Sequence, residues 1–538
     1  MVFSSANGPL RTQEKSCPNK VSFWRLLTDQ GVVTQDVLNY DYTGLGTESD
    51  PYIVSWIEHD VRNPMHFPLQ RKVTITFVTA FATLIVSLSS SAYAGSMERV
   101  IDSFHVGETV ATLGLSLFVL GFSVGPLVWA PLSEHLGRQI SFFVSFVCLA
   151  AFTAGCAGAE NIHTLLILRF FAGAVGSSPM TNAGGVVSDM FAARQRGLAL
   201  CLFAATPYFG PSLGPMIGGF LGMNGGWRWV QILLAISSGV VWAMIVISVP
   251  ETYAPVLLRK RAQRLSRVTG KYYRSTFDTQ RENVPVREQM QKLFLRPWVL
   301  LLREPIVLLL SFYASLIYGT LYMLFAAFPV VYGENRGWNA GVSGLPFLGV
   351  MVGTLLGALY TLYDNKRYIK AQKRGDGFAS PEERLYPCMV SALTIPIGLF
   401  WFAWTNSASI HWSASVLALV PFGFGIILIY LGIVNYLIDS YTIFAASVLA
   451  GMSILRYIFG AVFPLFTPYM YRALGLHWAS SVPAFLSTLC FPLPFLFYKY
   501  GPAIRKHCKY AALAQQHLQK LRNVPRTRPV AGENNEGV

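Results

Sequence analysis

Long apolar runs set the strongest limit on how this chain can fold. A bilayer core about 30 Å thick needs roughly 20 apolar residues in a helix to cross it. Backbone polar groups must be paired internally there, which favours helices over irregular chain. We count twelve such runs, near residues 73–93, 108–130, 139–158, 163–186, 197–221, 227–248, 306–331, 342–363, 386–404, 412–435, 443–467 and 478–498. The pattern predicts an all-α membrane protein with twelve transmembrane helices.

The composition agrees with this prediction. Only 13% of the 538 residues are charged, whereas a soluble domain carries about 25%. The first 70 residues are polar and show no cleavable signal pattern, so we expect the first run to act as the signal anchor. The cysteines and histidines are scattered, without metal-ligand spacing, and no P-loop is present. We therefore expect no metal, no cofactor and no enzyme activity.

Basic residues orient the helices, because Lys and Arg favour cytoplasmic loops. With the N-terminus inside, 36 of the 42 Lys and Arg residues fall on the cytoplasmic side and four fall outside. Both termini are therefore predicted to be cytoplasmic. The net charge of +15 reflects this bias, and nucleic-acid binding is the weaker explanation because the charges are spread over separate loops.

Six runs precede a basic loop and six follow it, which is typical of an internally repeated transporter. The predicted parts are a cytoplasmic tail (1–72), a six-helix half (73–248), a basic linker (249–305), a second six-helix half (306–498) and a C-terminal tail (499–538). The linker stretch LLRKRAQRL fits an amphipathic helix on the inner leaflet or a solvated linker equally well. We expect a monomer in contact with membrane lipids.

The loop between the second and third runs reads PLSEHLGRQ, with Glu134, Gly137 and Arg138. It predicts a tight turn whose charges pair with helix ends or with the opposite half and hold one gating state. A passive turn is the alternative. Asp189, at the end of the fourth run, is a further candidate for gating or proton binding.

Two arginines lie inside predicted spans, Arg169 and Arg456. A charge at that depth costs about 2.5–3.5 kcal/mol or more, so each should face protein or water and marks a candidate functional site. Arg169, Gly173 and Gly176 share one helix face. The alternative is a structural arginine bonded to neighbouring carbonyl oxygens.

The fifth run contains GPSLGPMIGG, which combines small residues with helix breakers. The glycines permit close helix approach, and the prolines free carbonyl groups and can bend the helix. We predict a hinge and a tight seam between the halves, whereas a plain packing seam would explain the glycines alone. The hinge residues are Gly210, Pro211, Gly214, Pro215, Gly218 and Gly219.

These stretches, together with VPETYAPVLLRKRA, SILRYIFGAVFPLFTPYMY and NPMHFPLQRK, resemble the major facilitator superfamily over residues 50–500. The closest resemblance is to its fungal twelve-span drug:proton antiporters, which include multidrug, polyamine and secondary-metabolite exporters. The resemblance implies the major facilitator fold, proton-coupled antiport and a role for Arg169 in proton coupling. Ala130, His135 and Gln139 depart from the family's loop pattern, which weakens the analogy of a charge relay there.

Asp439 is expected at the cytoplasmic start of the eleventh span, where a carboxylate suits a helix N-terminus. It could cap that helix or pair with Arg138 or Arg196. The proton carrier stays open among Asp189, Asp439, Glu134, Glu98 and the substrate itself, because arginine remains charged.

The central parts of the predicted spans carry no Asp or Glu. A polycation site would require such anionic partners, so we expect an amphiphilic organic substrate, with polyamine export as the alternative. Nutrient uptake and a membrane-embedded enzyme are weaker alternatives. The plasma membrane is the expected location, and the vacuolar membrane is the alternative. Candidate cavity residues are Tyr208, Tyr318, Tyr322, Tyr430 and Asn435.

Overall fold

The computed structural model describes residues 21–191, 193–280, 286–374 and 379–523. The first half of the bundle is formed by eight helices. These are α3 (Leu69–Gly95), α4 (Met97–Phe104), α5 (Glu108–Leu136), α6 (Arg138–Ala157), α7 (Ile162–Gly176), α8 (Ser178–Met190), α9 (Ala193–Gly225) and α10 (Trp227–Ser248). The short α4 lies on the connection from α3 to α5, and α7 and α8 together form one crossing.

The second half follows a connecting segment that ends in α13 (Val286–Arg303). Its helices are α14 (Pro305–Phe328), η2 (Pro329–Glu334), α15 (Ala340–Ser343), α16 (Phe347–Arg374), η3 (Pro381–Leu385), α17 (Tyr386–Thr405), α18 (Trp412–Tyr441), η4 (Thr442–Phe444), α19 (Ala445–Cys490), α20 (Pro492–His507) and α21 (Lys509–Asn523). Gly475 interrupts α19 with φ 74° and ψ 172°, so α19 consists of two helices joined by a turn.

Eight stretches of the described residues are long and apolar enough to cross a membrane. One of them, Trp412–His507, spans 96 residues. That stretch contains three crossings, because it is broken at η4 and again at Gly475. The α7–α8 pair and the proline-containing α9 complete the twelve crossings that the sequence predicts. The chain is an all-α membrane protein.

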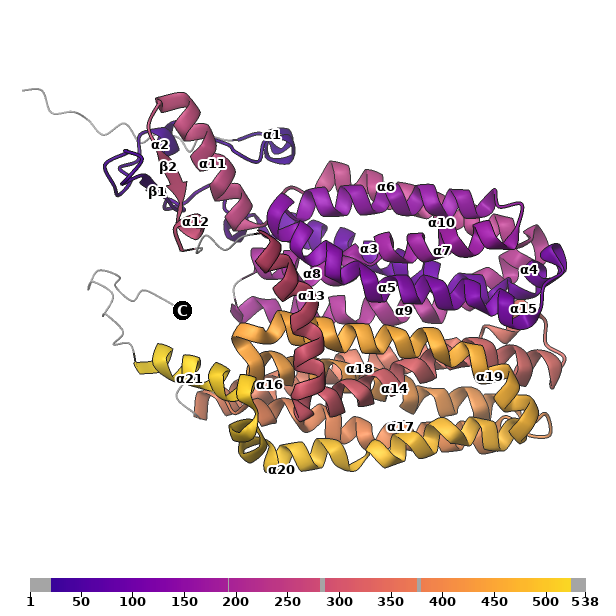
Figure 1. Cartoon of the computed structure of the whole chain (residues 1–538). Coiled ribbons are helices and arrows are strands. Elements are labelled where there is room, and N and C mark those ends of the chain that lie inside the picture. The colour runs from indigo at the N-terminus through magenta and orange to yellow at the C-terminus, as the bar shows by residue number, and fades with distance from the viewer. Residues whose placement is uncertain (1–20, 192, 281–285, 375–378, 524–538) are drawn as a thin grey trace, which may run out of the picture.

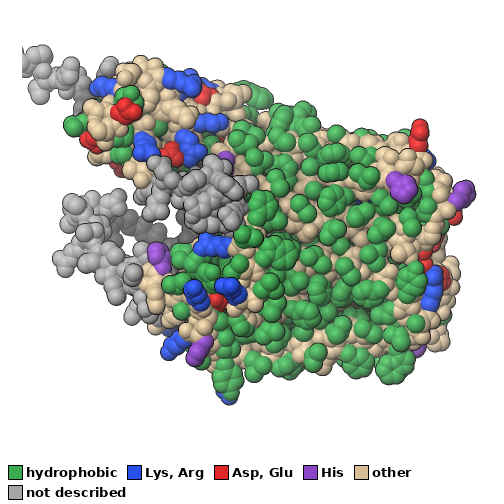
Figure 2. All heavy atoms as spheres, viewed as in Figure 1, with side chains coloured by type: hydrophobic (Ala, Val, Ile, Leu, Met, Phe, Trp, Pro, Cys, Tyr) green, Lys and Arg blue, Asp and Glu red, His purple; other side chains and the backbone are tan. Residues whose placement is uncertain are grey.

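The two halves lie side by side, with α5 against α19 and α9 against α16 (Figure 1). Apolar side chains cover the flank of the bundle, and charged side chains gather at its two ends (Figure 2). We call the end that carries the connecting segment and α20 the linker end, and the opposite end, near α4 and α15, the far end. A central apolar band between charged ends is the surface that a bilayer requires.

A small module sits at the linker end, beyond the bundle (Figure 1). It comprises α1 (Phe23–Thr28), α2 (Gln35–Leu38), β1 (Tyr52–Val54), η1 (Pro64–His66), α11 (Ala254–Thr269), β2 (Tyr273–Ser275) and α12 (Thr276–Gln280). The two strands pair in parallel with Tyr52 opposite Tyr273. Val37, Tyr42 and Val54 cover the apolar face of α11.

This module corrects the expectation for LLRKRAQRL. The leaflet-bound helix would need its apolar face free for lipid, but Leu258 and Leu265 of α11 are buried against the N-terminal segment. A buried ion pair joins the same segments, with Arg261 2% and Asp60 4% exposed. The plain solvated linker is equally excluded for α11, because six of its 16 residues are buried: Val256, Leu257, Leu258, Arg261, Ala262 and Leu265.

Candidate functional site

Arg456 of α19 is buried among tyrosine rings inside the bundle. Its guanidinium carbon lies 4.9 Å from the ring centre of Tyr318, 4.6 Å from that of Tyr430 and 4.8 Å from that of Tyr457. Tyr208 of α9 packs edge-on against Tyr430, with ring centres 5.8 Å apart. We call these four tyrosines the tyrosine cage. Because α9 belongs to the first half, the cage spans the interface between the halves.

A row of hydroxyl groups leads from the cage toward the second buried arginine. The hydroxyls of Tyr318 and Tyr322 are 3.3 Å apart, and the hydroxyls of Tyr322 and Ser90 are 2.9 Å apart. The carbonyl oxygen of Ser90 accepts a hydrogen bond of 3.3 Å from Arg169. The predicted cavity residues Tyr208, Tyr318, Tyr322 and Tyr430 therefore lie together, and their role in binding stays a prediction.

Arg169 is satisfied by the protein around it. Its Nε donates to the carbonyl oxygen of Gly114 at 2.5 Å, and Nη2 donates to the carbonyl oxygens of Ser89 and Ser90. The guanidinium also lies over the ring of Tyr93 at 4.4 Å. These contacts are those of the structural arginine that the sequence allowed as an alternative. Its part in proton coupling stays a prediction.

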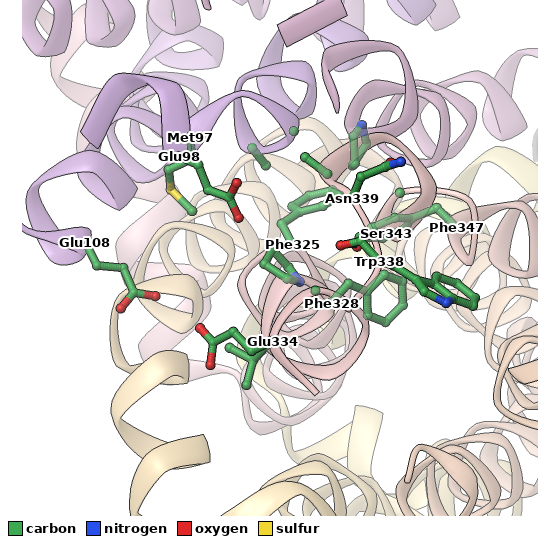
Figure 3. Close-up of a pocket in the computed structure, with 18 of the residues that line it drawn as sticks. Met97, Glu98, Glu108, Phe325, Phe328, Glu334, Trp338, Asn339, Ser343 and Phe347 are labelled. Atoms are coloured by element: carbon green, nitrogen blue, oxygen red, sulfur yellow. The ribbon is translucent and has the colours of Figure 1, made fainter. Parts of the chain in front are cut away.

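A cavity of about 520 Å³ opens at the far end, between the two halves. Aromatic side chains form its wall, with Phe325, Phe328, Trp338 and Phe347 directed toward it (Figure 3). Three carboxylates stand around it, Glu98 and Glu108 from the first half and Glu334 from the second. Sequence reasoning missed this cavity, because its wall is formed by α14, η2, α15 and α16 only after the halves have packed.

The glycines of GPSLGPMIGG form a seam with α3, inside the first half. A Cβ on Gly218 would lie 1.9 Å from the carbonyl oxygen of Ala92, and Gly210 and Gly214 make similar contacts with α3. We expected this seam between the halves. Of the four glycines, only Gly219 faces the second half, where an added Cβ would lie 2.5 Å from the carbonyl oxygen of Ala340.

The prolines of this motif lie within a continuous helix. α9 runs from Ala193 to Gly225 through Pro207, Pro211 and Pro215. Pro215 lines the far-end cavity. The expected hinge stays a prediction, because one arrangement of the helix does not show how it moves.

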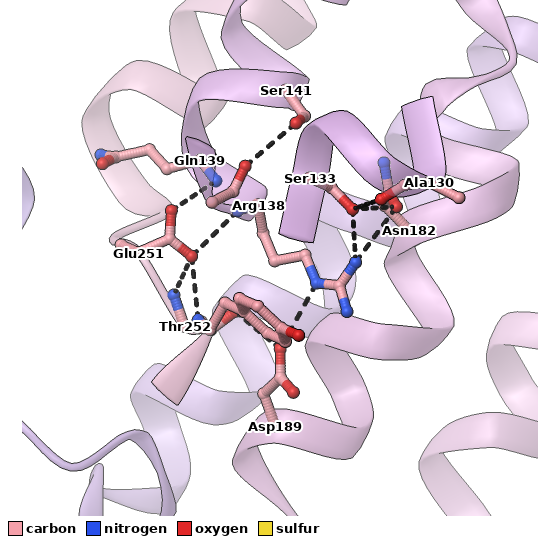
Figure 4. A network of polar contacts seen from close by, with 11 residues as sticks. Ala130, Ser133, Arg138, Gln139, Ser141, Asn182, Asp189, Glu251 and Thr252 are labelled. Atoms are coloured by element: carbon pink, nitrogen blue, oxygen red, sulfur yellow. Dashed lines mark hydrogen bonds and ion pairs between the residues drawn. The ribbon is translucent and has the colours of Figure 1, made fainter. Parts of the chain in front are cut away.

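The PLSEHLGRQ loop belongs to a polar network at the linker end (Figure 4). Arg138 pairs with Asp189 at 3.6 Å and donates to the hydroxyl of Ser133 at 2.7 Å and to the amide oxygen of Asn182 at 3.2 Å. All these partners lie in the first half, so the expected pairing of Arg138 with the opposite half is not seen. Glu134 is exposed, and no ion pair to it is recorded among the described residues.

Glu251, from the PETY stretch, holds the start of α6 in place. Its carboxylate accepts backbone N–H bonds from Arg138 at 2.9 Å and Gln139 at 3.1 Å, and also from Thr252 and Tyr253. A carboxylate at a helix N-terminus is stabilised by the unpaired N–H groups there. Sequence reasoning quoted this stretch without giving Glu251 a role. An acidic residue directly after the sixth span was the available signal.

We predict that Gly137→Ala destabilises this end of the bundle. Gly137 has φ +101°, and an added Cβ would lie 2.1 Å from Oε2 of Glu251. Gly226 is the matched control, because it precedes α10 with φ +83° and has open space around the Cβ position. Both variants carry backbone strain of about 1–3 kcal/mol, but only Gly137→Ala displaces a buried carboxylate. Thermal unfolding, monitored by size-exclusion chromatography, should show a clearly lower midpoint temperature for Gly137→Ala than for Gly226→Ala. Equal midpoint temperatures would contradict this prediction.

Asp439 was expected at the start of a helix, and that expectation is wrong. It lies near the C-terminal end of α18, where it pairs with Arg384 at 3.0 Å and accepts a hydrogen bond from Tyr368 at 3.1 Å. It does not pair with Arg138, which is held by Asp189, and the side chain of Arg196 lies outside the described residues. The positive charge of Arg384 compensates for the unfavourable position of a carboxylate at a helix C-terminus.

Asn435 is half-buried on α18, and no hydrogen bond of its side chain is recorded among the described residues. It does not join the tyrosine cage through any recorded contact. Sequence reasoning did not assign Ser90 to a site, although it links the two arginine environments. The hydroxyl of Tyr457, in the cage, accepts a 3.0 Å hydrogen bond from Arg456.

Comparison with known proteins places this arrangement in a family. The model of the Major Facilitator Superfamily matches residues 79–464. The chain is 59% identical to the major facilitator superfamily multidrug transporter mdrA of Aspergillus fumigatus, over 94% of this chain and 84% of that one. It is 46% identical to the efflux pump FUBT of Fusarium oxysporum, over 96% and 87%. It is 47% identical to the major facilitator-type transporter sorT of Penicillium rubens, over 89% and 92%. The chain belongs to the Major Facilitator Superfamily.

Proposed function

We propose that this protein is a proton-coupled exporter of small amphiphilic organic compounds that works by alternating access. The observation that carries the proposal is the tyrosine cage around Arg456, built from residues of both halves. A ligand bound there contacts both halves, so its binding depends on how they are arranged. The relatives named as a multidrug transporter and an efflux pump favour export over nutrient uptake.

The side assignment follows from charge. The linker end carries the basic segments, so we propose that it faces the cytoplasm and that the far end faces outward. The far-end cavity would then be the outer vestibule. We further propose that the protein acts as a monomer in the plasma membrane, and that the vacuolar membrane is the alternative location with the same orientation.

Asp189 is the proton-binding candidate that the geometry favours. It lies three residues beyond the fourth predicted span, at the cytoplasmic end in the proposed orientation. Its carboxylate pairs with Arg138 at 3.6 Å and accepts a hydrogen bond of 3.4 Å from the hydroxyl of Thr252. Protonation would weaken the ion pair with Arg138. Proton binding at Asp189 would thereby change the contacts between the ends of these helices.

The test is export from an efflux-deficient yeast that expresses the full chain. We expect retention of a neutral azole or an acidic aromatic compound to fall, and a protonophore to abolish this effect. The Asp189→Asn variant should reach the membrane but lose the dependence of export on the proton gradient, because it cannot ionise. Arg303→Gln, an exposed change on α13, is the control. Export by the wild type that persists with the gradient dissipated would refute proton coupling, and uptake in place of export would refute the direction.

A further inference from the structure

We propose that Arg456 binds the acidic group of a planar aromatic substrate, with the tyrosine cage holding the ring system. This inference rests on the proposed export function and adds the chemical class of the substrate and the residue that recognises it.

The first observation is the unmatched charge. Arg456 is 7% exposed, and its recorded neighbours are tyrosines rather than carboxylates. Its Nε has no hydrogen-bond partner. A buried cation without an anion is costly, and an unpaired buried donor adds to that cost. An anion bound at Arg456 would balance its charge and accept a hydrogen bond from its Nε.

Arg169 provides the internal comparison. It is equally buried, at 1% exposed, but its guanidinium is held by three carbonyl oxygens. Arg169 is therefore bonded to backbone carbonyl oxygens, whereas Arg456 donates to the hydroxyl of Tyr457 and its Nε has no hydrogen-bond partner. The difference indicates that the role of Arg456 is not to brace neighbouring helices.

The second observation is a continuous row of aromatic rings from Arg456 to the far-end cavity. Each member lies 4.5 to 5.4 Å from the next, measured between ring centres or from the guanidinium carbon of Arg456. The row runs through Tyr318, Tyr322, Phe325, Phe347, Phe328, Tyr332 and Trp338. Four of these residues line the cavity (Figure 3). A row of aromatic side chains favours a planar ring over a flexible polyamine as the substrate.

The third observation is the reversal of charge along that row. The cage holds a cation, while Glu98 and Glu334 stand exposed at the cavity. An anion that is attracted at Arg456 is repelled at the far end, so the charge distribution favours release there. A cationic substrate would be repelled by Arg456 and attracted by the carboxylates at the far end, which is unfavourable for its binding at the cage.

The experiment compares two probes with the same ring system, 2-naphthoate and 2-naphthamide, on the purified full-length protein. Only the first is ionised at neutral pH. We expect Arg456→Gln to weaken equilibrium binding of 2-naphthoate at least about tenfold, because a charge-assisted hydrogen bond is lost. Binding of 2-naphthamide should change less than about threefold. Arg456→Lys, which keeps the charge but not the planar fork, should fall between wild type and Arg456→Gln.

Each outcome decides between the possibilities. Equal weakening of both probes, or wild-type binding of the amide as tight as that of the acid, would overturn the role of Arg456. If Arg456→Gln does not elute as a folded monomer, the Arg456→Lys variant decides: unchanged 2-naphthoate binding would overturn the inference. Arg303→Gln should bind as the wild type does. Export of a neutral azole without any binding of 2-naphthoate would refute this inference alone, whereas absence of export for every compound would refute the proposed function.

Discussion

We expect the Asp60→Ala substitution to destabilise the small module at the linker end. Asp60 and Arg261 form a buried ion pair with two contacts, at 2.5 and 3.1 Å, between the N-terminal segment and α11. Removal of one partner leaves a buried charge unmatched, which costs about 3–5 kcal/mol. Arg62 would also lose a hydrogen bond, because its backbone N–H donates to Asp60. Its side chain donates to the carbonyl oxygen of Glu251.

Hydrogen exchange measured by mass spectrometry on peptides that contain β1 is the direct readout. A loss of that size predicts exchange at least about a hundredfold faster in the module. Arg264→Ala is the matched control on the same helix, because the pair of Arg264 with Asp29 is 45% and 23% exposed. Exposed pairs contribute about 0–1 kcal/mol, so exchange should scarcely change. Wild-type exchange in Asp60→Ala would show that the apolar contacts of the module hold it without the ion pair.

Gly219→Ala should open the far end, whereas Gly218→Ala should damage the first half. The two neighbours on α9 face different partners, since Gly219 meets Ala340 of the second half and Gly218 meets Ala92 of α3. In both cases the obstructing atom is a backbone oxygen, which moves only with its helix. Overpacking of this kind costs about 1–3 kcal/mol. For Gly219→Ala that cost falls on the closed arrangement of the halves.

Labelling of a Ser343→Cys reporter with a membrane-impermeant maleimide tests this difference. Ser343 lines the far-end cavity and is 5% exposed, so labelling depends on separation of the halves. We expect at least about tenfold faster labelling with Gly219→Ala, and a lower thermal midpoint without faster labelling with Gly218→Ala. Equal labelling of the two variants would show that Gly219 does not control this end.

The membrane class could be read from the chain because it depends on local composition. The first run, predicted at 73–93, corresponds to Leu69–Gly95, and the fifth, predicted at 197–221, corresponds to Ala193–Gly225. The turn between the last two crossings was also anticipated, and Gly475 supplies it through its positive φ. Side-chain hydropathy acts within one helix and needs no knowledge of its neighbours.

Contacts between residues far apart in the sequence could not be predicted in the same way. Asp439 has its cationic partner on another segment, Arg384, which is 55 residues away in the sequence. The module at the linker end depends on a pairing of Asp60 with Arg261, 201 residues apart. No local pattern in either stretch identifies the other, since charge complementarity among many arginines leaves several pairings open.

The sequence by itself determined the membrane-spanning helical class, the division into two halves and the presence of two arginines in costly positions. These properties follow from hydropathy and charge along the chain. Only the tertiary structure decided what the arginines do differently: Arg169 is saturated by carbonyl oxygens, whereas Arg456 has a free Nε inside a cage of tyrosines. The physical reason is that satisfaction of a buried donor depends on which helices surround it, and four helices from both halves must pack before that environment exists.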